Sequence, residues 1–422
     1  MASARPSTRT ARRRPISLPI RLLIAASAIA TLAAAPDDAR KVHDAAIVLD
    51  SHFDTPANLG RPGWSIIDRH SFAEDGDQVD WPRMVDSGVD GGFFAIFTGQ
   101  GARDEAGDHA ARDAALVRAV QIREMVAKHS DKFALALTAD DARRIAAEGK
   151  RIVFISMENG SPFAGDLSLM RTFRALGATT MGAVHTRNND LADSATDKPE
   201  WNGLSPKGKQ FVADANRLGV LIDASHASDD ATLQMAQLSK TPIILTHSGM
   251  RGVYNHPRNV PDAVAKAVAA KGGVIQINAF SGYMIDQQKI PERDAAMAEL
   301  RQQFGRASTP EQRRAMIAKR KEIDARWPVK RATFDDVIKH IVYAVRLVGI
   351  DHVGISGDFD GGGGVEGLDD ITGYPNVTAA LLKAGFSQSD VNKFWGGNAL
   401  RAIAAAQAAA EPGAVPAVPV TR

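Results

Sequence analysis

The chain has 422 residues, 44% of them hydrophobic and 24% charged, a composition that excludes a collagen, a coiled-coil rod and a wholly disordered protein. Cysteine is absent, which excludes disulfide bonds, thiolate metal sites and a cysteine nucleophile. Removing the six arginines of residues 1–35 from the 51 basic residues leaves 45 against 49 acidic ones, a net charge of −4. The pI of about 8.7 therefore reflects the N-terminal segment and does not indicate nucleic-acid binding.

Residues 1–35 have the pattern of a signal peptide. Five arginines within residues 5–14 precede an apolar region, whose cleanest run is 22–35 and ends in small residues. This run is shorter than the ~20 apolar residues that a membrane span requires. We therefore expect a protein exported to the periplasm or secreted, with no stable membrane span after cleavage. An uncleaved N-terminal anchor is the alternative.

Short apolar runs recur from residue 46 onward, and most gaps between them have a helical pattern, as at 110–128, 206–217, 229–238 and 260–271. Alternating buried strands and helices predict a parallel sheet, and eight such units predict a (β/α)8 TIM-type barrel over residues 36–401. A doubly wound open sheet is the alternative, although no G-x-G-x-x-G follows the first strand. The eight predicted strands are 46–50, 92–97, 152–157, 178–184, 219–224, 242–246, 273–278 and 353–357, with 133–137 as a ninth or accessory strand.

The gap between the seventh and eighth predicted strands contains a long polar segment, at about 285–332. Eight Lys or Arg and two acids lie between Arg313 and Arg331. A surface for an anionic partner is one interpretation of these basic residues, but we favour a solvated helical hairpin inserted into one loop of the barrel. Without interleaved aromatic residues it does not predict a nucleic-acid partner. Residues 402–422 are expected to form an Ala/Pro-rich tail.

Metal-ligating residue types follow six of the eight predicted strands. The carboxyl ends of barrel strands meet on one face, where active sites form, so these side chains are expected to converge. They are His52 and Asp54 after the first strand, Glu158 after the third, His185 after the fourth, His226 after the fifth, His247 after the sixth and Asp358 after the eighth.

Histidine and carboxylate ligands without cysteine suit zinc or another divalent first-row ion. His52 and Asp54 are two residues apart and can point to the same side of an extended segment. A pair of ions needs a shared ligand, and Glu158 can bridge them through its two oxygens. His226 and His247 would then bind the second ion, and Asp358 would complete the first.

Other catalytic motifs are absent or incomplete. The segment GDFDGGGG at 357–364 lacks the EF-hand ligand pattern, and its glycines predict a flexible loop over the site. The sequence contains no Walker loop and no G-x-S-x-G, so a phosphate-binding loop and a serine-hydrolase elbow are not indicated.

Several segments together resemble the membrane dipeptidase family, also called renal dipeptidase, of the amidohydrolase superfamily. The resemblance covers most of residues 45–400 and implies a (β/α)8 barrel with a binuclear zinc site. The stretch after Glu158 departs from the family, which commonly has Gly-Gly-His there. The segments are LDSHFDTP (49–56), SMENG (156–160), HTRNNDLAD (185–193), GLSPKGKQFV (203–212), NRLGVLIDASHAS (216–228), ILTHSGMRGVYNHPRNVPD (244–262), VGISGDFDG (353–361) and GGNALR (396–401).

The resemblance also implies a role for each site residue. Glu158 bridges the two zinc ions, His185 binds substrate and stabilises the tetrahedral intermediate, and Arg258 holds the C-terminal carboxylate of the dipeptide. Asp358 is the expected general base as well as a ligand. The ligands implied for the first zinc are His52, Asp54 and Asp358, and those for the second are His226 and His247.

We therefore expect an exported zinc dipeptidase that accepts a C-terminal D-residue, in a homodimer as the resemblance suggests. An N-acyl-amino-acid deacylase, or another amidohydrolase on the same metals, is the enzymatic alternative. A non-catalytic exported binding protein is the alternative of a different class.

Overall fold

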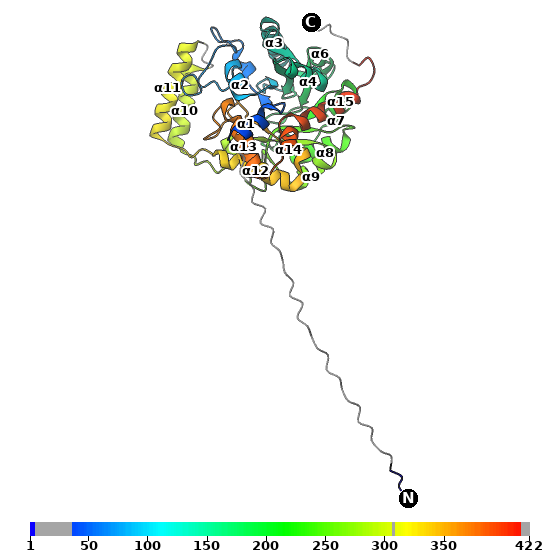
Figure 1. Ribbon diagram of the computed structural model, residues 1–422. Helices are drawn as coiled ribbons and strands as arrows, with labels where there is room; N and C mark the ends of the chain where they lie inside the picture. The colour runs from blue at the N-terminus through cyan, green and yellow to red at the C-terminus, as the bar shows by residue number, and fades with distance from the viewer. Residues whose placement is uncertain (5–35, 306–308, 415–422) are drawn as a thin grey trace. The chain divides into compact units, whose positions relative to one another are not determined.

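The computed structural model describes residues 1–4, 36–305 and 309–414, so the predicted signal peptide and the last part of the predicted tail lie outside the described residues. Every helix and strand belongs to the compact unit Ala33–Arg422 (Figure 1). None of the helices in the described ranges is long and apolar enough to cross a membrane.

Eight parallel strands form a nearly closed barrel, which confirms the predicted fold. The order β1-β2-β4-β5-β6-β7-β9-β10 follows the chain, and Phe53 bridges to Phe359 across the seam between the first and last strands. The strands are β1 (Leu49–Phe53), β2 (Gly91–Phe97), β4 (Arg151–Glu158), β5 (Ala178–Gly182), β6 (Leu221–Asp223), β7 (Ile244–Met250), β9 (Val274–Asn278) and β10 (Val353–Ser356). Two short strands lie off this path: β3 (Phe133–Leu135) pairs with β4, and β8 (Asn259–Val260) pairs with β7.

Helices follow most barrel strands, and local sequence signals set their ends. The helix after β5, for example, starts where the Ser205 side chain accepts a hydrogen bond from Gly208 N, and it ends at Gly219 with φ 64°. The α-helices are α1 (Pro36–Asp44), α2 (Trp81–Ser87), α3 (Glu105–Lys128), α4 (Ala139–Ala147), α5 (Ser161–Ala164), α6 (Leu169–Ala175), α7 (Pro206–Leu218), α8 (Asp229–Leu238), α9 (Asp262–Ala270), α10 (Pro291–Phe304), α11 (Pro310–Arg326), α12 (Phe334–Val348), α13 (Tyr374–Lys383), α14 (Gln388–Asn392) and α15 (Asn398–Ala408). The 3-10 turns are η1 (Thr55–Asn58), η2 (Ser281–Tyr283), η3 (Ile350–His352) and η4 (Ile371–Gly373), and η5 (Lys393–Gly397) is a π-helical turn.

Six of the eight predicted strand ends differ from the observed ones, and those of the first and sixth strands differ most. The first strand covers 49–53 rather than 46–50, and β7 extends to Met250, so His52 and His247 lie inside strands and not after them. In both strands the pairing register shifts near the histidine, between Asp50 and Phe53 and between Leu245 and Ser248. Such irregularities redirect side chains next to active sites.

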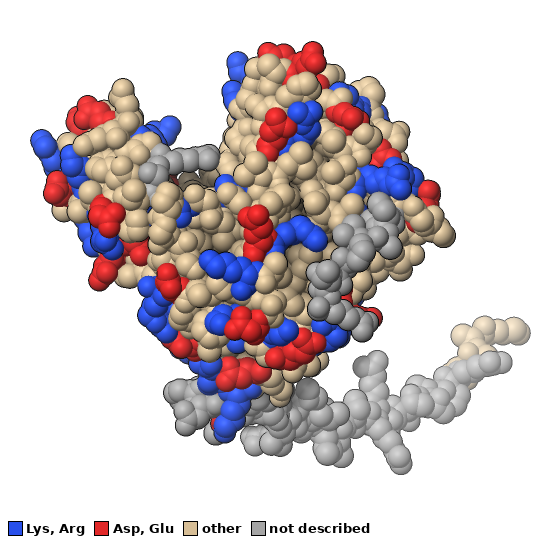
Figure 2. Space-filling model, turned by 90° about the horizontal axis from the view of Figure 1, so that it is seen from above, with Lys and Arg blue, Asp and Glu red and all other residues tan. Residues whose placement is uncertain are grey.

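The segment between β9 and α12 contains the expected helical hairpin, formed by α10 and α11. Figure 2 shows Lys and Arg side chains interspersed with Asp and Glu on this lobe, at the left of the view. At the other end of the chain, α15 continues into the predicted tail and buries Ile403 against the barrel.

His43, a buried histidine on α1, should make stability depend on pH. His43 Nε2 lies 2.9 Å from the Ser87 carbonyl and Nδ1 lies 2.7 Å from Thr378 Oγ1, partners that suit a neutral ring. Burial lowers the pKa of His43 to about 4, so the unfolded chain binds more protons between about pH 6.5 and 4. His43 should therefore lower the stability as the pH falls through this window, contributing a loss of ~2 kcal/mol between pH 7 and 5.

Urea unfolding at the two pH values tests this prediction. His43→Gln should reduce the pH-dependent loss by about 2 kcal/mol, whereas the exposed His109→Gln should leave it unchanged. An equal pH dependence in all three proteins would show that His43 does not titrate in this way.

Candidate metal centre

The predicted ligand side chains lie together at the carboxyl ends of the barrel strands. Glu158 Oε1 lies 2.9 Å from His226 Nε2 and 3.4 Å from His247 Nε2, while Oε2 lies 3.5 Å from His52 Nε2. The two oxygens of Glu158 therefore face different groups of side chains. Potential ligand atoms within 4.8 Å of one another form three overlapping sets: His52, Glu158 and His247; Glu158, His185 and His226; and His52, Asp54 and Asp358.

The donor set and its spacing fit divalent ions. Two atoms bound to one tetrahedral zinc ion at ~2.0–2.2 Å lie roughly 3.3–3.6 Å apart, and His52 Nε2 lies 3.3 Å from Asp54 Oδ2. His52 Nε2 is buried without a hydrogen-bond partner among the described residues. A buried ring nitrogen without a partner destabilises the fold, and a bound metal ion would supply the missing partner of His52 Nε2. These residues therefore fit a metal centre.

Burial and charge set the ionisation of the cluster. Burial opposes ionisation of Glu158, but the charge of His52 and hydrogen bonds from His226 and His247 outweigh it and hold its pKa well below the usual value. Burial lowers the pKa of His226 and His247 far below the ordinary range. The centre thus presents an ionised Glu158 and two neutral imidazoles, the forms that bind metal ions. Burial opposes protonation of His52, but the charges of Glu158 and Asp54 raise the pKa of this ring well above its ordinary value, so a bound ion has to displace a proton from His52.

Asp358 has a different environment from Glu158. Burial raises its pKa to about 7, although the charge of His52 opposes the shift. Its Oδ2 accepts a hydrogen bond of 2.9 Å from Asn278 Nδ2. A buried carboxyl group with a pKa near neutrality, held in one orientation, suits a general base.

Two of the predicted ligands occupy strained backbone positions. His226 has φ 68° and Asp358 has φ 51°, the left-handed region that non-glycine residues rarely adopt. The glycines of 357–364 predicted a flexible loop, but the structure ties this loop down. Asp360 accepts hydrogen bonds from Thr55 Oγ1 and Gln78 N. A Cβ atom at Gly361 would lie 2.0 Å from Asp54 Oδ2, so only glycine fits there.

The predicted substrate-binding residues border the same centre. His185 Nε2 lies 3.5 Å from Glu158 Oε1, and the ring lies edge-on to Phe97. Arg258 is buried, donates from Nη2 to the His247 carbonyl at 3.0 Å, and places its guanidinium 5.3 Å from the Tyr283 ring.

These side chains open onto a cavity of about 690 Å³. All of the predicted metal ligands except His52 line part of it, together with His185, Phe97, Phe280 and Tyr283. Arg61, Arg118, Arg313 and Asp360 also line it. The sequence predicted the metal ligands and His185, together with Arg258, which borders a small adjacent pocket. It did not predict the aromatic residues or the arginines.

Sequence reasoning missed several residues that contact the predicted ligands. Asn278 ends β9, so the strand-end criterion pointed to it, but only histidines and carboxylates were considered. Thr246 Oγ1 lies 3.0 Å from His247 Nδ1 and 2.5 Å from Asp223 Oδ2, which links that ring to a buried carboxylate. A metal-binding histidine is commonly oriented by such a contact.

Comparison with known proteins agrees with this geometry. The family model described as membrane dipeptidase (peptidase family M19) matches residues 36–415. A dipeptidase named tcpJ from Claviceps purpurea (strain 20.1) is 29% identical over 346 residues, covering 80% of this chain and 72% of that protein. The crystal structure of the probable dipeptidase PvdM from Pseudomonas aeruginosa is 32% identical, with a TM-score of 0.76, and covers 89% of this chain and 99% of its own.

A metallo peptidase from Rhodobacter sphaeroides, crystallised with a phosphinate mimic of the dipeptide L-Ala-D-Ala, shares the fold. Its TM-score is 0.67 at 22% identity, and the match covers 86% of this chain and 99% of that structure.

Proposed function

The chain belongs to the membrane dipeptidase family and is a metal-dependent dipeptidase, and from this premise we propose an exported enzyme with two zinc ions bridged by Glu158. Its substrates are dipeptides, including those with a C-terminal D-residue. The observation that carries the proposal is the convergence of six candidate nitrogen and oxygen ligands at the carboxyl ends of the barrel strands, where all but His52 line the cavity: His52, Asp54, Glu158, His226, His247 and Asp358. The signal-peptide pattern of residues 1–35 supports export.

Each site residue then has a defined task. Bound divalent ions would supply Lewis-acid polarisation and lower the pKa of water. Asp358 takes a proton from the attacking water and returns it to the leaving amine. His185 donates a hydrogen bond to the oxygen that becomes negative as the carbonyl is attacked. Arg258 pairs with the free carboxylate of the substrate, because its planar guanidinium matches a carboxylate in a bidentate geometry.

Metal analysis and a substrate panel test the proposal. The purified protein should contain close to two zinc ions and should hydrolyse L-Ala-L-Ala and L-Ala-D-Ala, and a chelator should abolish both activities until zinc is restored. L-Ala-L-Ala amide should react ~10–100-fold more slowly, because a charged hydrogen bond to Arg258 is lost.

N-acetyl-L-alanine is the discriminating substrate in the same panel. It has a C-terminal carboxylate but no dipeptide amide, and it should remain intact. Cleavage of this compound alone would replace the dipeptidase proposal with an N-acyl-amino-acid deacylase on the same centre. Cleavage of no compound in the zinc-loaded protein would contradict both.

A further inference from the structure

The cavity has a second polar wall that the metal centre and Arg258 do not account for. Arg61, Arg118 and Arg313 line it, and they come from three different elements. Arg61 follows η1, Arg118 lies on α3, and Arg313 lies on α11 of the inserted hairpin. We call these three residues the arginine wall. An inserted helix that was expected to be only a solvated surface element thus contributes to the active-site cavity.

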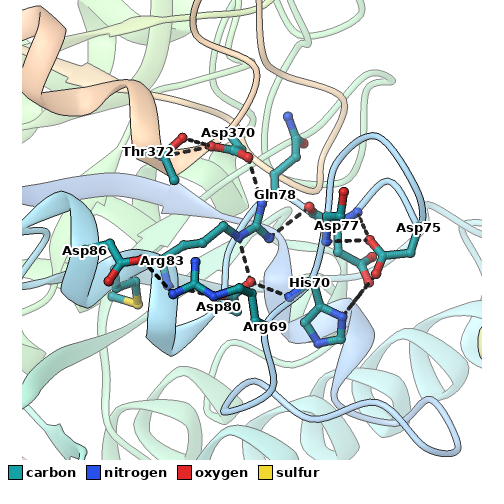
Figure 3. A network of polar contacts seen from close by, with 12 residues as sticks. Arg69, His70, Asp75, Asp77, Gln78, Asp80, Arg83, Asp86, Asp370 and Thr372 are labelled. Atoms are coloured by element: carbon teal, nitrogen blue, oxygen red, sulfur yellow. Dashed lines mark hydrogen bonds and ion pairs between the residues drawn. The ribbon is translucent and has the colours of Figure 1, made fainter.

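A buried carboxylate fixes two of these side chains. Asp77 is fully buried, and its Oδ1 lies 2.9 Å from Arg61 Nη1 and 3.4 Å from Arg313 Nη2. Its Oδ2 accepts a hydrogen bond of 3.0 Å from Trp64 Nε1. Figure 3 shows Asp77 within the polar network of the loop before α2, next to Asp75 and His70. Arg313 is further held because its Nε donates to the Asp75 carbonyl at 2.6 Å.

These contacts hold the guanidinium groups of Arg61 and Arg313 in place but do not use all of their hydrogen-bond donors. A guanidinium has five N–H donors, and Arg61 Nε is buried with no hydrogen-bond partner in the described part of the chain. Arg61 and Arg313 both pair with the single carboxylate of Asp77, so these two guanidinium groups carry one positive charge more than the acid that holds them. A fixed positive charge in a cavity favours one anionic group on the ligand.

The arginine wall and Arg258 lie at different parts of the centre. Arg258 contacts β7 through the His247 carbonyl, next to the histidines of the proposed second ion. The wall adjoins the carboxyl end of β1. There, η1 follows Asp54, a proposed ligand of the first ion. A dipeptide that binds Arg258 through its C-terminal carboxylate, and places its amide at the centre, directs its amino-terminal residue away from β7 and toward this wall.

We propose that the arginine wall is a subsite for an anionic side chain on the amino-terminal residue of the substrate, so that the preferred dipeptides begin with an acidic residue. This inference rests on the proposed dipeptidase function and specifies its substrate class. The surface is indented between the α10–α11 lobe and the rest of the viewed face, which agrees with an opening beside α11 (Figure 2).

The test compares L-Glu-L-Ala with L-Gln-L-Ala, which have nearly the same size and differ in one charge. The zinc-loaded full-length enzyme should show a kcat/KM at least about tenfold higher for L-Glu-L-Ala. Arg313→Gln should reduce this ratio roughly tenfold. Arg314→Gln is the matched control, because Arg314 is the next residue of the same helix, is exposed and pairs with Glu311, and it should retain the wild-type ratio.

The outcomes separate this inference from the proposed function. Hydrolysis of L-Ala-L-Ala with equal kcat/KM for the Glu and Gln dipeptides would overturn the anionic subsite and leave the dipeptidase intact. The same conclusion would follow if Arg313→Gln lowered both values equally, because that pattern indicates a general structural effect. Failure to hydrolyse L-Ala-L-Ala or any other dipeptide would overturn both.

Discussion

Replacement of Glu158 with Gln is expected to remove at least one bound metal ion and to lower dipeptide turnover by roughly 10³-fold. The two oxygens of Glu158 face His226 and His247 on one side and His52 on the other. Glutamine keeps the size of the side chain, but its amide nitrogen cannot bind a cation, and it removes the negative charge between the proposed ions. Metal analysis of the purified variant and kcat for L-Ala-L-Ala measure both effects.

The chain offers a control cluster of similar composition. Ligand atoms of His70, Asp75 and Asp77 also lie within 4.8 Å of one another. Arg61 and Arg313 already neutralise Asp77, so this cluster has little charge left to attract a cation. His70→Gln should therefore keep the wild-type metal content. Retention of both ions by Glu158→Gln, or loss of an ion from His70→Gln, would show that the centre has been placed wrongly.

Strand patterning predicted the barrel because buried parallel strands read as apolar runs whatever their neighbours are. It also predicted that the candidate ligand side chains lie close together, as they do, because the parallel strands of one barrel present their carboxyl ends on one face. It misplaced the boundaries of β1 and β7, because the register shifts at His52 and His247 depend on pairing with adjacent strands. Local sequence does not encode that pairing.

The arginine wall shows a different limit of sequence reasoning. Arg313 is one of eight basic residues between positions 313 and 331, and nothing local separates it from its neighbours. Its place in the cavity depends on Asp77, which is 236 residues away in the chain. Asn278 was missed for a simpler reason, since a strand-end amide was not counted as a residue that orients a carboxylate.

Replacement of Asp358 with Asn is expected to lower kcat by about 10³-fold with little change in the fold. The variant keeps the size of the side chain, and asparagine tolerates the left-handed backbone of this position, where φ is 51°. Burial raises the pKa of Asp358 to about 7, which means that the buried negative charge is unfavourable. Replacing the carboxylate with a neutral amide therefore should not destabilise the fold. Asparagine cannot accept the proton of the attacking water, and the chemical step is lost.

The opposite end of the same strand provides the control. Asp351 precedes β10 on the amino-terminal face of the barrel, where it is exposed and pairs with Lys393 at 2.7 Å. Residues at this face serve stability, and those at the carboxyl face serve catalysis, so Asp351→Asn should retain wild-type kcat for L-Ala-L-Ala. Thermal melting and metal content of both variants separate loss of the base from loss of the fold or the ion. Turnover near the wild-type value in Asp358→Asn with metal bound would exclude Asp358 as the base and leave its role to metal binding alone.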